Sequence, residues 1–214
     1  KCALENLQRQ GFQCYLPTFP SEKLRQGVLM VMDDPQAGMK ALAECVRPDG
    51  AVGIMVYAKY GRIGVTWLQS MFRDMGLGQD EDSVRMVRTA TSLLGPDHPI
   101  QSYFKIANDL DYDAGLVDTF LIGREKTYDV EECLGLIEGA GLVFQDGLGK
   151  SPYNVPAFND RETNEFLTQI KNLPERQMWS VVEPLRNQSG CHLFTACRPE
   201  RPEQTYRIDF ESPA

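Results

Sequence analysis

Residues 28–57 read VLMVMDDPQAGMKALAECVRPDGAVGIMVY, and this stretch decides the fold that the sequence predicts. Its apolar ends, 28–32 and 51–57, are typical of strands that are buried on both faces. Between them, Asp33-Asp34-Pro35 favours a helix start, because an acidic residue can cap the first turn and proline suits the first helical position. The segment 47–50 (RPDG) favours a turn. The order strand, helix, turn, strand predicts a right-handed βαβ unit.

The rest of the chain predicts further elements around this unit. A helix is expected to begin at the capping residue Asp129 and to end at Gly141, because the apolar residues between them recur at helical spacing. Two helices after the central strand form an insertion of the kind that covers the substrate side of many α/β enzymes. The expected fold class is α/β, a partial Rossmann-like sheet with a helical substrate-cap insertion. Helices are expected at 66–75, 83–94, 161–171 and 174–186, and strands at 142–144 and 192–197.

The sequence pattern changes near Gly27, and this change divides the chain into parts. Residues 1–27 predict one helix and one short strand, and a piece of that size cannot bury enough surface to fold alone. We therefore expect three parts: the N-terminal segment 1–27, a body at 28–198 and a polar tail at 199–214. Because the chain begins with Lys1, we expect a fragment or a processed product, and the charged start predicts no signal peptide.

Charge is distributed unevenly between these parts. The net charge is −8, but residues 1–27 hold four basic and two acidic residues, so the remainder carries −10. An acidic body repels phosphate backbones, which argues against nucleic acid as a partner of residues 28–214. The apolar run 51–58 is too short to span a membrane. Six cysteines without a CxxC pair, and only two histidines, predict free thiols, no metal site and a cytoplasmic location.

Ligands of an open α/β sheet bind beyond the carboxyl ends of its strands, and this rule nominates two segments of the chain. One is 29–34, after the first body strand, and the other is 57–62 (YAKYGR), after the central strand. The second segment offers two aromatic rings, Tyr57 and Tyr60, and the cation Arg62, so we expect these three residues on the substrate side. The alternative is a solvated loop whose tyrosines pack beneath the inserted helices. We assign no catalytic residue.

Asp118 is a further candidate, because it interrupts the apolar run 115–121. A buried carboxylate without a partner costs free energy. We therefore expect Asp118 to pair with a cation such as Arg62 or Arg124, or else to contact the substrate.

The segments 27–35 (GVLMVMDDP), 46–50 (VRPDG) and 113–121 (DAGLVDTFL) resemble class I S-adenosylmethionine-dependent methyltransferases, and the resemblance extends over residues 27–198. It implies transfer of a methyl group from S-adenosylmethionine to an acceptor that the sequence does not identify. It also implies that Val28, Leu29 and Met30 contact the cofactor. The glycine-rich cofactor loop of that family has no match in this chain. We therefore expect only the C-terminal half of the domain, and impaired methyl transfer.

Residues 3–12 (ALENLQRQGF) and 15–17 (YLP) resemble the N-terminal domain of NusG-type transcription elongation factors. This second resemblance implies RNA polymerase as a partner of residues 1–27. Two alternatives to the enzyme therefore stay open: a binding segment of the transcription elongation or antitermination type, and a non-catalytic fused fragment.

Overall fold

The computed structural model describes residues 24–26, 29–147, 153–155, 161–186 and 189–206, so the helix and strand expected within residues 1–23 lie outside it. Contacts divide the chain into two compact units. The first, here called the sheet unit, comprises Lys1–Val56, Val130–Lys150 and His192–Ala214. The second, the helical unit, comprises Tyr57–Asp129 and Ser151–Cys191. The boundaries expected near Gly27 and Pro199 stay predictions.

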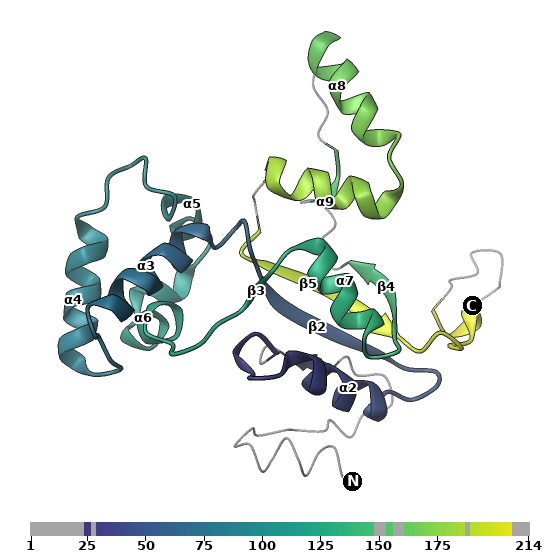
Figure 1. The fold of residues 1–214 in the computed structure, drawn as a ribbon, viewed down its shortest axis with the longest axis horizontal. Coiled ribbons are helices and arrows are strands. Elements are labelled where there is room, and N and C mark those ends of the chain that lie inside the picture. The colour runs from purple at the N-terminus through teal and green to yellow at the C-terminus, as the bar shows by residue number, and fades with distance from the viewer. Residues whose placement is uncertain (1–23, 27–28, 148–152, 156–160, 187–188, 207–214) are drawn as a thin grey trace, which may run out of the picture. The chain divides into compact units, whose positions relative to one another are not determined.

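A mixed sheet runs through the chain in the order β1-β2-β5-β4 (Figure 1). Strand β1 pairs in parallel with the first half of β2, and β3 pairs in parallel with the last two residues of β2. Strands β4 and β5 are antiparallel. The α/β fold class is therefore confirmed. The strands are β1 (Leu24–Gln26), β2 (Ala51–Ala58), β3 (Thr127–Tyr128), β4 (Val143–Gly147) and β5 (Cys191–Cys197).

Strand β2 is the central element that the sequence predicts. Its residues Val52, Ile54, Val56 and Ala58 are all 2% exposed or less. Gly53 on the other face is buried as well, so the strand is covered on both sides. An unbroken apolar run suits this position, because both faces of the strand are largely shielded from water, with Ala51, Met55 and Tyr57 half-buried.

The strand predicted at 28–32 is wrong. The strand that pairs with β2 is β1, and a 3-10 turn, η1 (Leu29–Val31), follows it. A short apolar run does not distinguish a buried strand from a buried helical turn. Here the turn is favoured by packing on Gly38, since a β-carbon at that position would lie 2.6 Å from the sulfur of Met32 and 3.0 Å from Cδ2 of Leu29.

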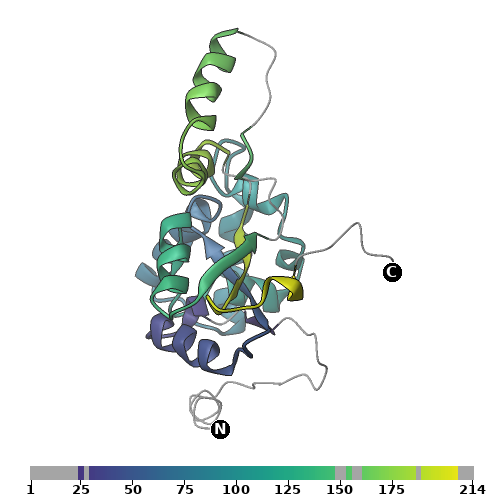
Figure 2. The same ribbon diagram turned by 90° about the vertical axis from the view of Figure 1, so that its right-hand side faces the viewer.

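Two helices of the sheet unit, α2 (Pro35–Cys45) and α7 (Val130–Glu138), lie where the sequence predicts them, and the predicted cap of α2 is confirmed. The Asp34 carboxylate accepts a hydrogen bond of 2.9 Å from the amide of Ala37 at the start of α2. Helix α7 starts after Asp129, and Gly141 ends it with a φ of +73°. Figures 1 and 2 show the two helices side by side on one face of the sheet, and Gln36 Nε2 joins them by donating to the carbonyl of Leu136 at 3.2 Å.

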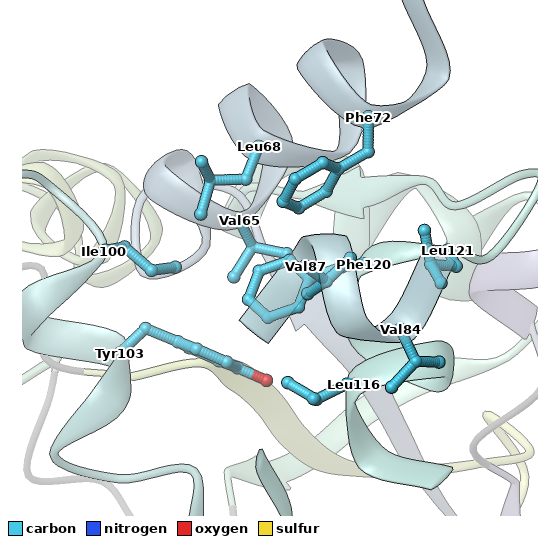
Figure 3. Packing of buried hydrophobic residues seen from close by; sticks show 10 residues of the cluster. All are labelled: Val65, Leu68, Phe72, Val84, Val87, Ile100, Tyr103, Leu116, Phe120 and Leu121. Atoms are coloured by element: carbon cyan, nitrogen blue, oxygen red, sulfur yellow. The ribbon is translucent and has the colours of Figure 1, made fainter. Parts of the chain in front are cut away.

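The helices of the helical unit between residues 57 and 129 gather around one apolar core (Figure 3). The predicted helices at 66–75 and 83–94 are present but begin earlier, and the short elements α5, η2 and α6 were not predicted, because four to eight residues give little periodicity. The helices are α3 (Ile63–Asp74), α4 (Glu81–Ser92), α5 (Gln101–Phe104), η2 (Asn108–Asp111) and α6 (Asp113–Phe120). The core comprises Val65, Leu68, Phe72, Val84, Val87, Ile100, Tyr103, Leu116, Phe120 and Leu121.

The last helices, α8 (Arg161–Lys171) and α9 (Glu175–Arg186), agree with prediction, and Pro184 lies inside α9. They pack against each other through Leu167, Ile170 and Val182. After β5 comes the 3-10 turn η4 (Glu203–Thr205). In the part of the chain that the structure describes, no helix has the length and apolar character needed to cross a membrane.

Gly64 tests how tightly α3 packs in the helical unit. A β-carbon there would lie 2.6 Å from Cα of Ile100 and 2.7 Å from the carbonyl carbon of Pro99, and backbone atoms cannot easily move aside. We expect Gly64→Ala to lower the free energy of unfolding by about 1–3 kcal/mol, the usual cost of overpacking. Urea unfolding followed by tryptophan fluorescence measures this, because both tryptophans, Trp67 and Trp179, belong to the helical unit.

Gly123→Ala is the matched control in the same unit, since no atom lies within 4 Å of a β-carbon at that position. Its stability should be unchanged or slightly higher. Equal effects of the two substitutions would contradict the close approach of α3 to Ile100.

Candidate functional site

The segment 57–62 joins β2 to α3 in a tight turn. The amide of Lys59 donates to the carbonyl of Tyr128 at 2.8 Å, and the Lys59 ammonium pairs with Asp129 at 3.0 Å. A β-carbon at Gly61 would lie 2.5 Å from the carbonyl carbon of Ser189, so glycine is required by a close approach of backbone to backbone. The turn is therefore fixed on both sides.

Arg62 ends this turn and is buried, with 1% of its surface exposed. Its Nε donates to Oε1 of Glu125 at 3.1 Å, and its Nη2 donates to Oε2 at 2.8 Å. The Glu125 side chain is 2% exposed. This two-point geometry matches the planar guanidinium to the planar carboxylate, which is the strongest form of ion pair that side chains make.

Two tyrosines and a glutamine complete the surroundings of the pair. Arg62 Nη1 donates to the hydroxyl of Tyr103 at 2.5 Å, and the guanidinium carbon lies 3.7 Å from the ring centre of Tyr57. Gln69 Nε2 donates to Glu125 Oε2 at 3.1 Å and to the carbonyl of Thr119 at 2.8 Å. A cation over an aromatic face is favourable, more so when both are shielded from water.

Burial sets the protonation of this cluster. It raises the pKa of Tyr57 from its ordinary 10.0 to about 12, against the opposing charge of Arg62, and Asp118 and Glu125 raise it further. It also raises the pKa of Tyr103, again opposed by Arg62. Burial acts to lower the pKa of Arg62, but Glu125 and the two tyrosines together raise it above its ordinary value. The cluster therefore holds a charged Arg62 and protonated phenols at neutral pH.

The three residues expected on the substrate side have different environments in the structure. Arg62 is buried and engaged by Glu125 and Tyr103, so it is not available to a ligand. Tyr57 and Tyr60 are each half-buried, and each keeps some surface in contact with water. The structure brings Tyr57 and Arg62 together by stacking, whereas it records no such contact between Tyr60 and Arg62.

Asp118 differs from the expectation of a buried carboxylate. The run 115–121 falls mostly in helix α6, so its charged residue turns outward, and Asp118 is exposed. The partner of Arg62 is Glu125 instead. The charge of Asp118 still reaches Tyr57, because it contributes to the raised pKa of that phenol.

Sequence reasoning missed Glu125, Tyr103 and Gln69. Glu125 stands between Arg124 and Lys126 in the sequence and has the pattern of a solvated charge run. Gln69 lies two helical turns after Arg62, on the face that carries buried Leu68 and Phe72, and that spacing was the one available signal.

The residues expected to contact the cofactor lie in the sheet unit. Val28 is outside the described residues, and Leu29 and Met30 are 1% and 0% exposed. Their side chains belong to the core around α2. A ligand beside this turn would meet its backbone rather than these side chains.

No protein-family profile matches the chain. An uncharacterized protein of Synechococcus sp. is 29% identical over 123 residues, which cover 55% of this chain and 30% of that protein. Among solved structures, PKMT2 from Rickettsia typhi aligns with a TM-score of 0.62 and 8% identity over 93% of this chain and 41% of its own. PKMT2 from Rickettsia typhi in complex with AdoHcy aligns with a TM-score of 0.55 and 11% identity over 78% of this chain and 34% of its own.

The two structural likenesses show that the chain shares the α/β fold of PKMT2 from Rickettsia typhi. The chain spans about a third of the Synechococcus protein and well under half of each PKMT2 chain. The resemblance of residues 1–27 to NusG-type factors is not shown by them, and it stays a prediction, as does RNA polymerase as a partner.

Removing one member of the Arg62–Glu125 pair should destabilise the helical unit strongly. Glu125→Gln leaves a buried cation without its counter-charge, and breaking such a pair costs about 3–5 kcal/mol. The double variant Arg62→Met with Glu125→Leu removes both charges and should cost less than either single substitution. Urea unfolding with tryptophan fluorescence compares the wild type, the single variants Arg62→Met and Glu125→Leu, and the double variant, and additive losses would contradict a coupled pair.

Tyr57 should make stability sensitive to alkaline pH. Because its folded pKa is about 12 and its ordinary value is 10.0, the unfolded chain ionises first as pH rises. The folded state therefore loses stability between about pH 10 and pH 12. Tyr57→Phe keeps the ring over Arg62 but removes this ionisation, so its loss of stability over that range should be smaller.

Urea midpoints measured from pH 9 to pH 12 test this expectation. Tyr112→Phe, at a 69% exposed position of the same unit, is the control and should follow the wild-type curve. A Tyr57→Phe curve parallel to wild type throughout would contradict the assignment.

Proposed function

We propose that this chain forms part of an S-adenosylmethionine-dependent methyltransferase, to which it brings the C-terminal portion of the cofactor sheet and a helical unit for the methyl acceptor. The fold likeness supports the enzyme class. The carboxyl end of β2 supports the acceptor side, because ligands of α/β sheets bind beyond the carboxyl ends of the strands. The observation that carries the proposal is the fixed cluster there, with Tyr57 held over Arg62 at 3.7 Å.

On the cofactor side, the turn Leu29–Val31 follows the carboxyl end of β1. Its side chains are committed to the core, so we assign it a backbone contact to the cofactor. When bound, S-adenosylmethionine supplies a methyl group activated by its sulfonium sulfur. The residues of this turn then contribute one wall of the binding site. The glycine-rich loop that the resemblance expects to form the rest is not in these 214 residues.

On the acceptor side, the residues of the cluster act by orientation rather than by proton transfer. Tyr57 keeps its proton at neutral pH and presents a half-buried phenol as a hydrogen-bonding group and an apolar ring. Arg62 and Glu125 are positioning residues, since they hold that ring without being exposed. Holding an acceptor in line with a donor can supply a large share of a rate enhancement.

A cytoplasmic location is part of the same proposal. The cysteines that the structure describes, Cys45, Cys133, Cys191 and Cys197, are free thiols. Free thiols persist in a reducing compartment.

Calorimetric titration with S-adenosylmethionine tests the proposal. The longest natural polypeptide that contains this chain is expected to bind the cofactor. The 214-residue chain, which brings one wall of the site, is expected to bind at least roughly tenfold more weakly, a loss of about 1.4 kcal/mol. Absence of heat from both folded proteins at millimolar cofactor would contradict the methyltransferase proposal. Equal affinities of the two proteins would contradict the expectation that the 214-residue chain supplies only one wall of the cofactor site.

A further inference from the structure

The helical unit contains a hollow of about 310 Å³ that the cluster around Arg62 does not use. It is bordered by the end of α4, by the segment from α5 to η2, and by α6, which packs against both α4 and η2. Small-molecule sites begin at about 300 Å³, so this volume suits one small ligand and excludes a nucleotide-sized one.

The floor of the hollow is apolar. Leu116 is 3% exposed and belongs to the core of the helical unit shown in Figure 3. Phe104, Ala107 and Leu110 line the hollow and pack against the same core while staying partly exposed. An apolar group placed here would cover surface that now meets water, which is favourable in proportion to the area covered.

The walls are fixed before any ligand arrives. Arg88 on α4 donates from Nε at 3.1 Å and from Nη2 at 2.6 Å to Oδ1 of Asp113, and Nη2 also donates to the carbonyl of Asp111 at 3.2 Å. These bonds tie α4 to η2 and α6. Gly115 lets η2 lie directly on α6, since a β-carbon there would be 2.6 Å from the carbonyl carbon of Asp109. A pre-formed site loses little entropy on binding.

The rim carries the cation Arg88, which is paired with Asp113, and the anion Asp111. Arg88 uses Nε and Nη2 in its clamp, and its Nη1 has no partner among the residues that the structure describes. The carboxylate of Asp111 likewise makes no hydrogen bond or ion pair within the described part of the chain. The hydroxyls of Thr91 and Ser92 donate to backbone carbonyls of their own helix, which leaves their oxygens as acceptors.

We propose that this hollow binds a free α-amino acid with an apolar side chain, or a small zwitterion of the same shape. The side chain occupies the floor formed by Phe104, Ala107, Leu110 and Leu116. The ligand carboxylate pairs with Arg88 Nη1, and the ligand ammonium pairs with Asp111. Because the open groups at the rim are a guanidinium nitrogen, Arg88 Nη1, and the Asp111 carboxylate, a zwitterion is favoured over an ion of a single sign.

Three probes of one shape test the proposal on the full 214-residue chain by calorimetry or by changes in amide NMR shifts. L-Phenylalanine carries both charges, 3-phenylpropionate lacks the ammonium, and phenethylamine lacks the carboxylate. We expect L-phenylalanine to bind, and each of the other two to bind at least roughly tenfold more weakly, because each loses a charge-assisted hydrogen bond. Equal binding of 3-phenylpropionate would overturn the zwitterion assignment, and no binding of any probe at millimolar concentration would overturn the site.

Two substitutions locate the binding. Ala107→Trp fills the floor and should abolish binding, whereas Ala114→Trp, at an exposed position of α6 outside the hollow, should leave it unchanged. Asp111→Asn keeps the shape of the rim. It should weaken the binding of L-phenylalanine roughly tenfold without affecting the binding of 3-phenylpropionate. Unchanged melting temperatures establish that the variants are folded. Binding that survives Ala107→Trp would place the ligand elsewhere, and no step of this test involves S-adenosylmethionine.

Discussion

The buried pair of Arg62 and Glu125 is the constraint on which the helical unit depends. Two charges taken out of water are tolerated only where geometry and further hydrogen bonds compensate for the lost hydration. Tyr103 and Gln69 supply those bonds, and each comes from a different element. The pair therefore fixes the end of β2, the start of α3 and the segment before β3 together. It is neutral as a unit, so it orders this region without adding charge to it.

The second constraint is the close approach of two backbone segments to each other. It occurs at three places in the helical unit, and each place has a glycine. Gly61 allows the turn after β2 to touch Ser189, Gly64 allows α3 to touch Ile100, and Gly115 allows η2 to lie on α6. At each place a side chain would separate two backbones that the ion pair or the core brings together. The position of Arg62 relative to its partners thus depends on residues that make no polar contact themselves.

Patterns among neighbouring residues predicted much of the fold. They did not predict the site, because its residues contact one another across long distances in the sequence. The cap at Asp34, the stop at Gly141 and the buried strand β2 each follow from a few neighbouring residues. The predicted strand 28–32 was wrong because an apolar run fits a buried turn equally well. Asp118 was misplaced because α6 is too short to show its period. Glu125 was missed because it lies 63 residues from Arg62, and only the folded chain brings them together.

Three arginines of this acidic chain share one role. Arg62 binds Glu125, Arg198 donates to the carbonyls of Val46 and Ala43, and Arg201 donates to the carbonyl of Asp49. These guanidinium groups join segments far apart in the sequence, so an anionic ligand would have to break structural bonds to reach them. Arg88 differs, because its clamp leaves Nη1 open beside an apolar hollow. A ligand carboxylate can therefore bind there at little structural cost, whereas an extended polyanion would meet a net charge of −8.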